Sequence, residues 1–459
     1  MLDMARKEII SCILIVVLGF FLRFLWISVQ GMSHVGDILY ERLAVNLLAG
    51  HGFTTMDQLP FSPTAVRPPL YSLWIALVYA LFGQNLVTIF YSQAFIGAIT
   101  SVVVYWIGRE VHSPKAGLLS AFIYAIHPYP QLFVTTLFPE VFYSLLLALT
   151  VLFLWRAWKR ETDIQQWILA GVFSGLAALT RSEFFPFALF IVCLILVFRK
   201  SRRLIRGGMV FLLAMMLTVL PWTIRNYIHF KKILPISNSF YGVMFMVTTL
   251  DESEYDQKQH PSAFYAQPPS YANSYPMAVK LFEVFSDPKN YNRVNEIAIY
   301  DEQAFPIGVE KVKKDPLGYL IRRLKEVPYL WIESGNYVLN FVDPRITKTP
   351  WKQLLKKPDW WIFSWKFFGL VVTSLLPLGL ALFALWRYRH WGNNLIPLIS
   401  VPLFVTLIHL PFWFEVRYTV PTYPIVFVLT AMGMIKRVVS CQSSVARKGK
   451  RGRGRNNEY

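Results

Sequence analysis

Long apolar runs, separated by short polar loops, follow one another along most of this 459-residue chain. A helix needs about 20 mostly apolar residues to cross the hydrocarbon core of a membrane, which is roughly 30 Å thick. The runs of about this length cover residues 8–28, 86–107, 116–134, 139–155, 165–180, 184–198, 207–222, 363–386, 394–411 and 418–435. The pattern predicts an all-α polytopic membrane protein with about 10 transmembrane helices.

One further apolar run, "PPLYSLWIALVYALFG" (Pro68–Gly83), is interpreted differently because it holds only about 14 apolar residues. That length favours a helix at the membrane surface, and prolines are well tolerated at the first positions of a helix. A second short helix is predicted by Leu39, Leu43 and Leu47, which recur every four residues and form one apolar stripe. The first outer loop, residues 30–83, is therefore expected to carry two interfacial helices.

Positive charge is distributed unevenly over the loops between these spans. With the short run outside the membrane, the alternate short loops and the two termini hold 22 Lys and Arg residues. The short loops on the opposite side hold only Arg42, Arg67, Arg181 and Arg417. The positive-inside rule then predicts a multi-pass protein of the cell (inner or plasma) membrane with both termini in the cytoplasm.

The order of apolar and polar segments divides the chain into four regions. Residues 1–222 form an N-terminal membrane module, 223–362 an extra-cytoplasmic insert, 363–436 the remaining spans and 437–459 a basic cytoplasmic tail. The insert is too long to be a plain connection between two helices. Its later part, "DPLGYLIRRLKEVPYLWIES", has helical apolar spacing and is expected to fold back on the membrane.

Composition agrees with this architecture, because 55% hydrophobic and only 16% charged residues exclude an ordinary soluble domain. The first run contains Arg23 but no small-residue cleavage site, so we interpret it as a retained anchor. A net charge of +19 could indicate a nucleic-acid partner, but the charge lies largely in short loops and the tail, where membrane topology explains it. We expect no nucleic-acid binding. The cysteines Cys12, Cys193 and Cys441 show neither pairing nor metal-ligand spacing.

Ionisable residues near the outer ends of the spans are the candidates for chemistry. They are Asp37, Glu41, Glu140, Arg181, Glu183, Arg225, Glu415 and Arg417. Taken alone, Asp37 is more simply interpreted as a helix N-cap, and each arginine as a side chain that reaches toward the membrane interface. Charges cost about 2.5–3.5 kcal/mol at the bilayer centre and less near the interface, so they are usually paired or functional. Together these residues predict a mixed acidic and basic cleft on the outer face.

Such a cleft suits the transfer of a sugar from a lipid phosphate. Arginines bind and neutralise the departing phosphate through planar, permanently charged guanidinium groups. A carboxylate accepts the proton of the attacking hydroxyl, or binds a divalent ion that polarises the phosphate. The sequence specifies no cofactor, and a divalent cation, Mg²⁺ or Mn²⁺, is left open because no ligand-triad spacing is present.

Several motifs, in a fixed order, carry a resemblance to a known family. They are "D…LA.NLLAGHGF…RPPLYSLWIALVYALFG" from Asp37 to Gly83, "PE" at 139–140, "GLAALTR" at 175–181, "PWTIRNY" at 221–227 and "E.RY..P..P" from Glu415 to Pro424. The chain resembles bacterial membrane glycosyltransferases of fold class C (the GT-C fold). The resemblance is to the protein O-mannosyltransferase-like group, which includes the aminoarabinose and galacturonate transferases acting on lipid A.

This resemblance implies a polyprenyl-phosphate-linked sugar donor, an active site at the outer face, and inverting transfer to a lipid, glycan or protein acceptor. It implies that Asp37 is the catalytic acid of the first loop and Glu140 a second catalytic acid. The residues expected to bind the donor phosphate are Arg67, Arg181 and Arg417. The residues expected to support them are Glu41, Arg225, Glu415 and Tyr418. Transferases that modify proteins carry an adjacent Asp-Glu pair where this chain has Gly36, Asp37 and Ile38, which disfavours a protein acceptor.

Two other functions are compatible with many spans and one large outer loop. An O-antigen ligase or polymerase would place its key arginines and a histidine in the large loop, where this chain offers His260 alone. A transporter or flippase of lipid-linked sugars usually has two related halves, and no internal repeat is present here. The glycosyltransferase hypothesis accounts for the outer cleft, whereas neither alternative does.

Overall fold

The computed structural model describes residues 2–30, 35–199, 201–238, 241–249, 294–332, 351–356, 359–412 and 416–436. Most of these residues are helical, and two very short strands and several loops make up the rest. The helices of the first half are α1 (Leu2–Gln30), α2 (Ile38–Leu48), α3 (Pro69–Phe82), α4 (Leu86–Val111), α5 (Pro114–Ile126), α6 (Pro128–Leu132), η1 (Phe133–Thr135), α7 (Glu140–Lys159), α8 (Ile164–Thr180), η2 (Ser182–Phe184), α9 (Phe187–Phe198) and α10 (Arg202–Phe230).

The second half contains the helices of the insert and the last part of the bundle. They are α11 (Tyr241–Thr248), α13 (Val294–Lys314), α14 (Pro316–Ile332), α17 (Trp351–Lys356), α18 (Trp360–Leu370), the π-helix η6 (Val371–Leu375), α19 (Leu376–Arg387), η7 (Arg389–Leu395), α20 (Ile396–His409), η8 (Val416–Thr422) and α21 (Tyr423–Met434). The strands are β1 (Val35–Gly36) and β2 (Thr136–Leu137).

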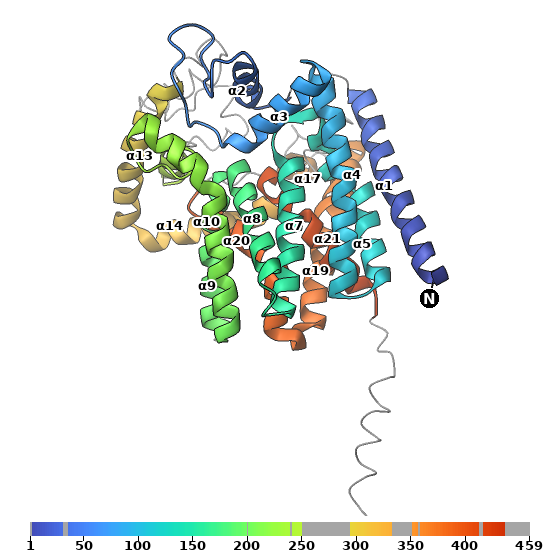
Figure 1. Ribbon diagram of the computed structural model, residues 1–459. Coiled ribbons are helices and arrows are strands. Elements are labelled where there is room, and N and C mark those ends of the chain that lie inside the picture. The colour runs from blue at the N-terminus through green and yellow to red at the C-terminus, as the bar shows by residue number, and fades with distance from the viewer. Residues whose placement is uncertain are drawn as a thin grey trace, which may run out of the picture.

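Most of the long helices run side by side in one bundle, with α1 at its edge (Figure 1). The helices α2 and α3 lie across one end of this bundle, which we call the α2–α3 end (Figure 1). Both are too short to cross a membrane, at 11 and 14 residues. The two helices predicted in the first outer loop are therefore confirmed as helices.

Six helices in the described part of the chain are long and apolar enough to cross a membrane: Arg6–Val29, Leu86–Val111, Glu140–Lys159, Arg202–Phe230, Trp360–Arg387 and Arg389–His409. The other four predicted spans correspond to shorter helices, namely α5, α8, α9 and α21. The run at 116–134 divides after Ile126 because Pro128 opens a separate helix, α6. The run at 207–222 continues as one helix through Pro221 as far as Phe230, and the boundary of the insert stays a prediction. The multi-pass architecture is confirmed, and ten spans stay a prediction.

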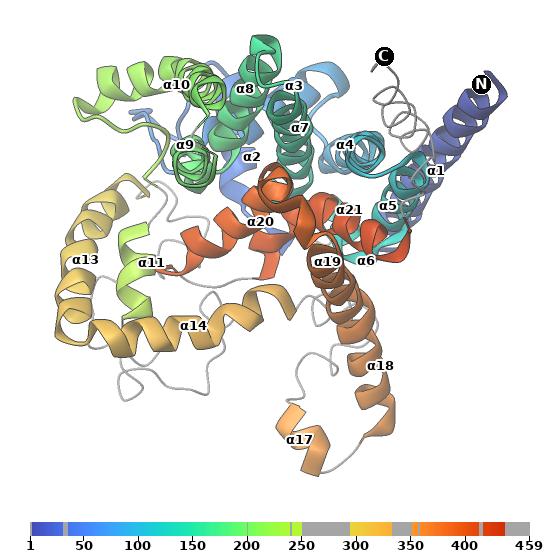
Figure 2. The ribbon, with the colours of Figure 1, turned by 90° about the horizontal axis from the view of Figure 1, so that it is seen from below.

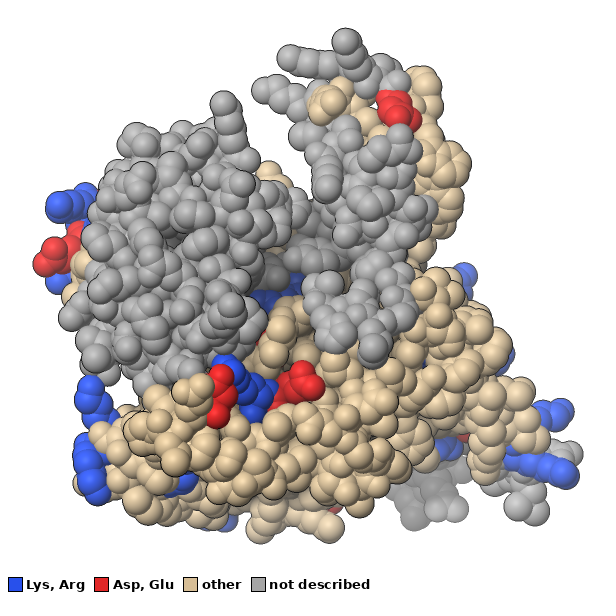
Figure 3. All heavy atoms as spheres, turned by 90° about the horizontal axis from the view of Figure 1, so that it is seen from above, with Lys and Arg blue, Asp and Glu red and all other residues tan. Residues whose placement is uncertain are grey.

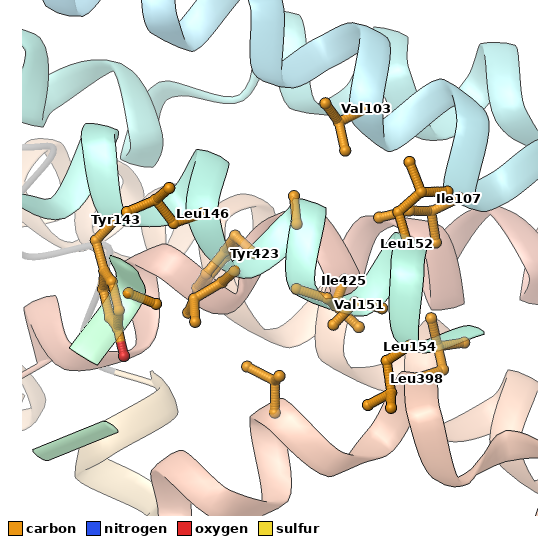
Figure 4. Packing of buried hydrophobic residues seen from close by; sticks show 14 of the residues in the cluster. Val103, Ile107, Tyr143, Leu146, Val151, Leu152, Leu154, Leu398, Tyr423 and Ile425 are labelled. Carbon is orange, nitrogen blue, oxygen red and sulfur yellow. The ribbon is translucent and has the colours of Figure 1, made fainter. Parts of the chain in front are cut away.

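Helix α7 lies at the centre of the bundle and provides much of the hydrophobic core. Figure 4 shows its Leu152 beside Ile107 of α4 and its Leu154 beside Leu398 of α20, and all four side chains are buried. Because lipid is as apolar as leucine, close packing holds such helices together more than burial from water does. The core thus fixes α7, whose first residue is Glu140.

Glycines bring α8 and α10 unusually close together. Gly171 lies against the backbone of Phe211, and a Cβ on Gly175 would stand 2.6 Å from the Cβ of Thr218. The two glycines are four residues apart on one face of α8, the small-residue spacing that lets membrane helices approach. This contact positions the end of α8, directly before Arg181.

The edge helix α1 is held to the bundle by Arg23, which is fully buried. Its Nη1 donates a hydrogen bond to the carbonyl of Gly19 at 2.8 Å, and its guanidinium carbon lies 5.4 Å from the centre of the Tyr124 ring. A Cβ on Gly97 would come within 2.5 Å of Nε, so only glycine leaves room for this side chain. The arginine therefore docks α1 on α4 and α5.

The insert forms a group of helices beside the bundle, and α14 crosses the direction of the spans in both views (Figures 1 and 2). One face of α14 exposes Leu317, Leu320 and Leu324, while Arg323 and Leu330 are buried on its other side. The predicted helix is confirmed, and its contact with the membrane stays a prediction. The earlier part of the insert, including His260, lies outside the described residues.

A two-residue parallel ladder joins the first loop to the start of α7. Val35 pairs with Thr136 and Gly36 with Leu137, and the Asp37 N–H donates to the Leu137 carbonyl at 3.3 Å. A Cβ on Gly36 would lie 2.5 Å from the Leu137 nitrogen, so glycine permits this close approach. The ladder brings the N-terminus of α2 next to that of α7.

Replacing Gly36 with Ala tests this contact, because the added Cβ would force the two strands apart. We expect G36A to lower the stability by about 1–3 kcal/mol, measured as a lower apparent Tm in detergent. The control is G379A, since a Cβ at Gly379 meets no atom within 4 Å. Equal melting temperatures for G36A and G379A would contradict a required ladder.

Candidate functional site

The first charged pair of the candidate site joins Asp37 to Arg67. Asp37 is the N-cap of α2, and its Oδ1 accepts a hydrogen bond from the Leu39 N–H at 3.1 Å. Its Oδ2 accepts from Arg67 Nε at 2.6 Å, and the two side chains are only 17% and 16% exposed. Asp37 can therefore cap α2 and pair with Arg67 at the same time, because each interaction uses a different carboxylate oxygen.

Arg67 is brought to Asp37 by the loop that connects α2 to α3. Asn46 on α2 donates to the carbonyls of Thr54 and Met56 at 2.7 and 2.9 Å. The Thr64 N–H donates to the Phe53 carbonyl at 3.0 Å. These bonds fix the loop on both sides of its tip, so it returns to α2 directly before Pro68 and Pro69.

Arg225, predicted as a supporting residue, holds this loop from α10. Its Nη1 donates to the Thr64 carbonyl at 2.8 Å and its Nη2 to the Phe53 carbonyl at 3.3 Å. Its guanidinium also lies over the Trp222 ring, 4.7 Å from the ring centre. Arg225 therefore acts on Arg67 through the backbone of this loop.

The second charged cluster surrounds Arg181, at the end of α8. Its Nη1 contacts Glu140 Oε1 at 2.9 Å and its Nε contacts Glu183 Oε1 at 2.5 Å. Glu140 is the first residue of α7 and is only 1% exposed. A helix N-terminus favours a negative charge at this position. Its burial and its bond to Arg181 favour a role in holding that arginine over the direct catalytic role predicted for Glu140.

Aromatic rings complete the surroundings of Arg181. Its guanidinium carbon lies 4.8 Å from the centre of the Tyr418 ring and 5.9 Å from that of Tyr143. Arg417, the next predicted phosphate-binding residue, lies over the Phe138 ring at 4.2 Å and 5.6 Å from the Tyr418 ring. The Tyr418 ring therefore lies near two of the predicted arginines, and its supporting role stays a prediction.

Tyr40 was not predicted as a site residue. Burial raises the pKa of its hydroxyl well above the usual value. The guanidinium groups of Arg67 and Arg181 lower that pKa, and the carboxylates of Asp37 and Glu140 raise it. The β1–β2 ladder places the two clusters near each other, because it sets Asp37 beside Leu137, shortly before Glu140. The position of Tyr40, one helical turn after Asp37, is the sequence signal that identifies it.

The supporting roles predicted for Glu41 and Glu415 stay predictions. Glu41 accepts a hydrogen bond from the Tyr79 hydroxyl at 2.7 Å and so binds α2 to α3. Glu415 lies outside the described residues. His409 was missed by the sequence analysis, although its ring stacks on Tyr418 with ring centres 4.5 Å apart. Its place at the end of a long apolar run made it look like an ordinary core residue.

Lys or Arg atoms are visible near the centre of the surface at the α2–α3 end (Figure 3). Within the described part of the chain, no three His, Cys, Asp or Glu side chains come together as a metal site. Asp37 uses one oxygen for the helix cap and the other for Arg67. A divalent cation held by Asp37 and Glu140 stays an untested prediction.

Residues 66–224 match the family model described as dolichyl-phosphate-mannose-protein mannosyltransferase. The match covers less than half of the chain. It includes Arg67, Glu140 and Arg181 but neither Asp37 nor Arg417. No curated protein sequence matches the chain.

Solved structures of an archaeal oligosaccharyltransferase share the fold. AglB from Archaeoglobus fulgidus, in complex with an inhibitory peptide and a dolichol-phosphate, has a TM-score of 0.53 at 14% identity, over 98% of this chain and 52% of that one. The Archaeoglobus fulgidus enzyme tethered with an acceptor peptide gives a TM-score of 0.53 at 16% identity, over 98% and 51% of the two chains. This chain thus spans about half the length of the structures it matches.

A structure of ArnT from Cupriavidus metallidurans in the apo state aligns with a TM-score of 0.39 at 13% identity, over 94% of this chain and 77% of that one. The oligosaccharyltransferase likeness shows the fold, which is the GT-C fold of polytopic membrane glycosyltransferases. The fold class predicted from the sequence is therefore confirmed.

Replacing Arg181 with Met would leave Glu140 and Glu183 buried next to each other without their shared countercharge. Breaking a buried ion pair in this way costs about 3–5 kcal/mol, so we expect a large fall in apparent Tm for R181M. The control is R42M, which breaks the exposed Arg42–Asp57 pair and should cost about 0.2–1 kcal/mol. Similar stability losses in the two variants would show that the Arg181 cluster is not a buried network.

Proposed function

We propose that this protein is an integral-membrane glycosyltransferase that moves a sugar from a polyprenyl-phosphate donor to a lipid, glycan or protein acceptor. The observation that carries this proposal is that the β1–β2 ladder brings the Asp37–Arg67 pair to the start of α7, where Arg181 pairs with Glu140 and lies, like Arg417, near the Tyr418 ring. The GT-C fold supports it, as does the family model that covers residues 66–224. The AglB structure whose fold this chain shares was solved with a dolichol-phosphate, which is a polyprenyl phosphate.

The arginines of the site are suited to the phosphate of the donor. As the bond to the sugar breaks, negative charge builds on the departing phosphate, and fixed cations at this place lower the barrier. Guanidinium groups stay charged at any physiological pH and offer several N–H donors in one plane. Arg181 and Arg417 flank the Tyr418 ring, and Arg67 approaches from the first loop. We assign donor-phosphate binding to these three residues.

Asp37 is the residue that we assign as general base. Its carboxylate is fixed by the α2 N-terminus and by Arg67, so its orientation is set before any substrate binds. In the reaction, the acceptor oxygen bonds to the anomeric carbon while the bond from that carbon to the phosphate oxygen breaks. The acceptor proton passes to Asp37, and the electron pair of the broken bond leaves with the phosphate. Attack from the face opposite the phosphate inverts the configuration, whether the sugar is a hexose or a pentose.

We place the site at the outer face of the cell (inner or plasma) membrane, with both termini in the cytoplasm. The distribution of charge supports this orientation. Most Lys and Arg residues of the short loops lie at the opposite end of the bundle, and short loops rich in these residues usually face the cytoplasm. A lipid-linked donor at this face would reach the site from within the membrane. The acceptor would be a cell-envelope lipid such as lipid A, a glycan or a protein.

Replacing Asp37 with Asn tests the base directly, because Asn still caps a helix but does not accept the proton. We expect D37N to lose about 10²–10⁴-fold in kcat, measured as sugar transfer from a polyprenyl-phosphate donor. Its apparent Tm should also fall, because Arg67 loses its countercharge. The control is D57N, which removes an exposed carboxylate paired with Arg42 in the same loop. Wild-type turnover by D37N would remove the assignment of Asp37.

Replacing Arg417 with Ala tests donor binding, because it removes one cation expected to contact the phosphate. We expect the KM for the donor to rise about tenfold and the KM for the acceptor to stay unchanged. The control is R389A, since Arg389 lies over the Trp386 ring at 5.0 Å, in the loop at the opposite end of α20. An equal change in both KM values would count against a phosphate-binding role.

A further inference from the structure

Three consecutive backbone carbonyls after α20 are all bound by side chains of the insert. Arg323 on α14 donates through Nε to the Leu410 carbonyl at 2.9 Å and through Nη2 to the Phe412 carbonyl. The Tyr319 hydroxyl, one turn earlier on α14, donates to the Pro411 carbonyl at 3.1 Å. One face of α14 therefore holds the whole turn that follows α20.

Further hydrogen bonds attach the insert on both sides of this turn. Thr248 of α11 also donates to the Pro411 carbonyl at 3.1 Å. Near the end of α14, Trp331 Nε1 donates to the Thr406 hydroxyl of α20 at 3.1 Å. The Thr419 hydroxyl of η8 donates to the Leu330 carbonyl at 3.2 Å. The insert is thus joined both to α20 and to η8, the element that carries Arg417.

Arg323 is the central residue of this attachment. Its side chain is 5% exposed, and its Nη1 contacts Glu326 Oε2 at 2.5 Å. A planar guanidinium that bonds two carbonyls and a carboxylate fixes all three relative to one another. Its neighbour Arg322 is 35% exposed and contacts Asp315 at 3.1 Å. Two adjacent arginines of one helix therefore have different surroundings.

The turn that Arg323 holds continues directly into the candidate site. His409 precedes Leu410 and stacks on Tyr418. Tyr418 lies in turn under the guanidinium of Arg181. A displacement of the turn would therefore move the His409 ring and, through the ring stack, Tyr418, which lies near both arginines.

We propose that Arg323 is a positioning residue of the glycosyltransferase site, which acts through the carbonyls of Leu410 and Phe412 to orient Tyr418 and Arg417 toward the donor phosphate. The inference rests on the proposed function. It makes α14 of the insert a component of the donor site, even though α14 follows the segments that carry Asp37, Glu140 and Arg181.

The test compares R323A with its matched neighbour R322A in the full-length protein. Amide hydrogen exchange at residues 409–422 reads the turn directly, and the KM values for donor and acceptor read its consequence. For R323A we expect faster exchange at 409–422 and a donor KM raised about tenfold, with the acceptor KM unchanged. For R322A we expect wild-type values of all three. If R323A folds poorly, R323K serves as the second variant. It keeps a charge and N–H donors, so its donor KM should lie between those of R323A and the wild-type protein.

Each other outcome removes one of the proposals. Faster exchange with unchanged donor KM would make Arg323 merely structural, and unchanged exchange would show that it does not hold the turn. Wild-type protein that binds undecaprenyl phosphate but transfers no sugar would instead remove the proposed function. In that case the affinity for undecaprenyl phosphate would test the positioning role of Arg323. R323A should weaken this binding, and R322A should leave it unchanged.

Discussion

Charged side chains at the end of an apolar bundle must be paired, because water is too scarce there to solvate them and each lone charge is costly. In this protein the partners come from different parts of the chain. Arg181 at the end of α8 meets Glu140 at the start of α7, and Asp37 meets Arg67 across the first outer loop. Satisfying these pairs therefore brings four separate segments to one place, and this place is the candidate site.

The same pairing prepares the site for an anionic ligand. Each carboxylate holds a guanidinium in one orientation, so little reorganisation remains when a phosphate arrives. The N-termini of α2 and α7 lie side by side because of the β1–β2 ladder, and both favour negative charge. Gly36 permits this approach, and Arg23 with Gly97 fixes the helix that leads to it. Close packing at Gly36 and Gly97 thus helps to determine where the charged side chains are placed.

The insert has a closer relation to the bundle than its position in the chain suggests. By sequence it separates two groups of spans, and its composition differs from theirs. In the structure, α14 crosses the spans and binds the turn after α20 through Arg323 (Figure 2). One face of α14 is therefore bound to the turn after α20, while Leu317, Leu320 and Leu324 stay exposed.

The sequence by itself determined which segments are helical and which of their ends carry the charged candidate residues. Membrane-spanning length and apolar periodicity are local properties, so α2, α3 and the long spans could be predicted. Asp37 could likewise be identified as the N-cap of α2. Only the tertiary structure decided the partners. Glu41 turns to Tyr79, Glu140 is buried against Arg181, and Asp37 pairs with Arg67. These contacts join residues that are distant in sequence, and they depend on how closely helices pack, which local patterns do not specify.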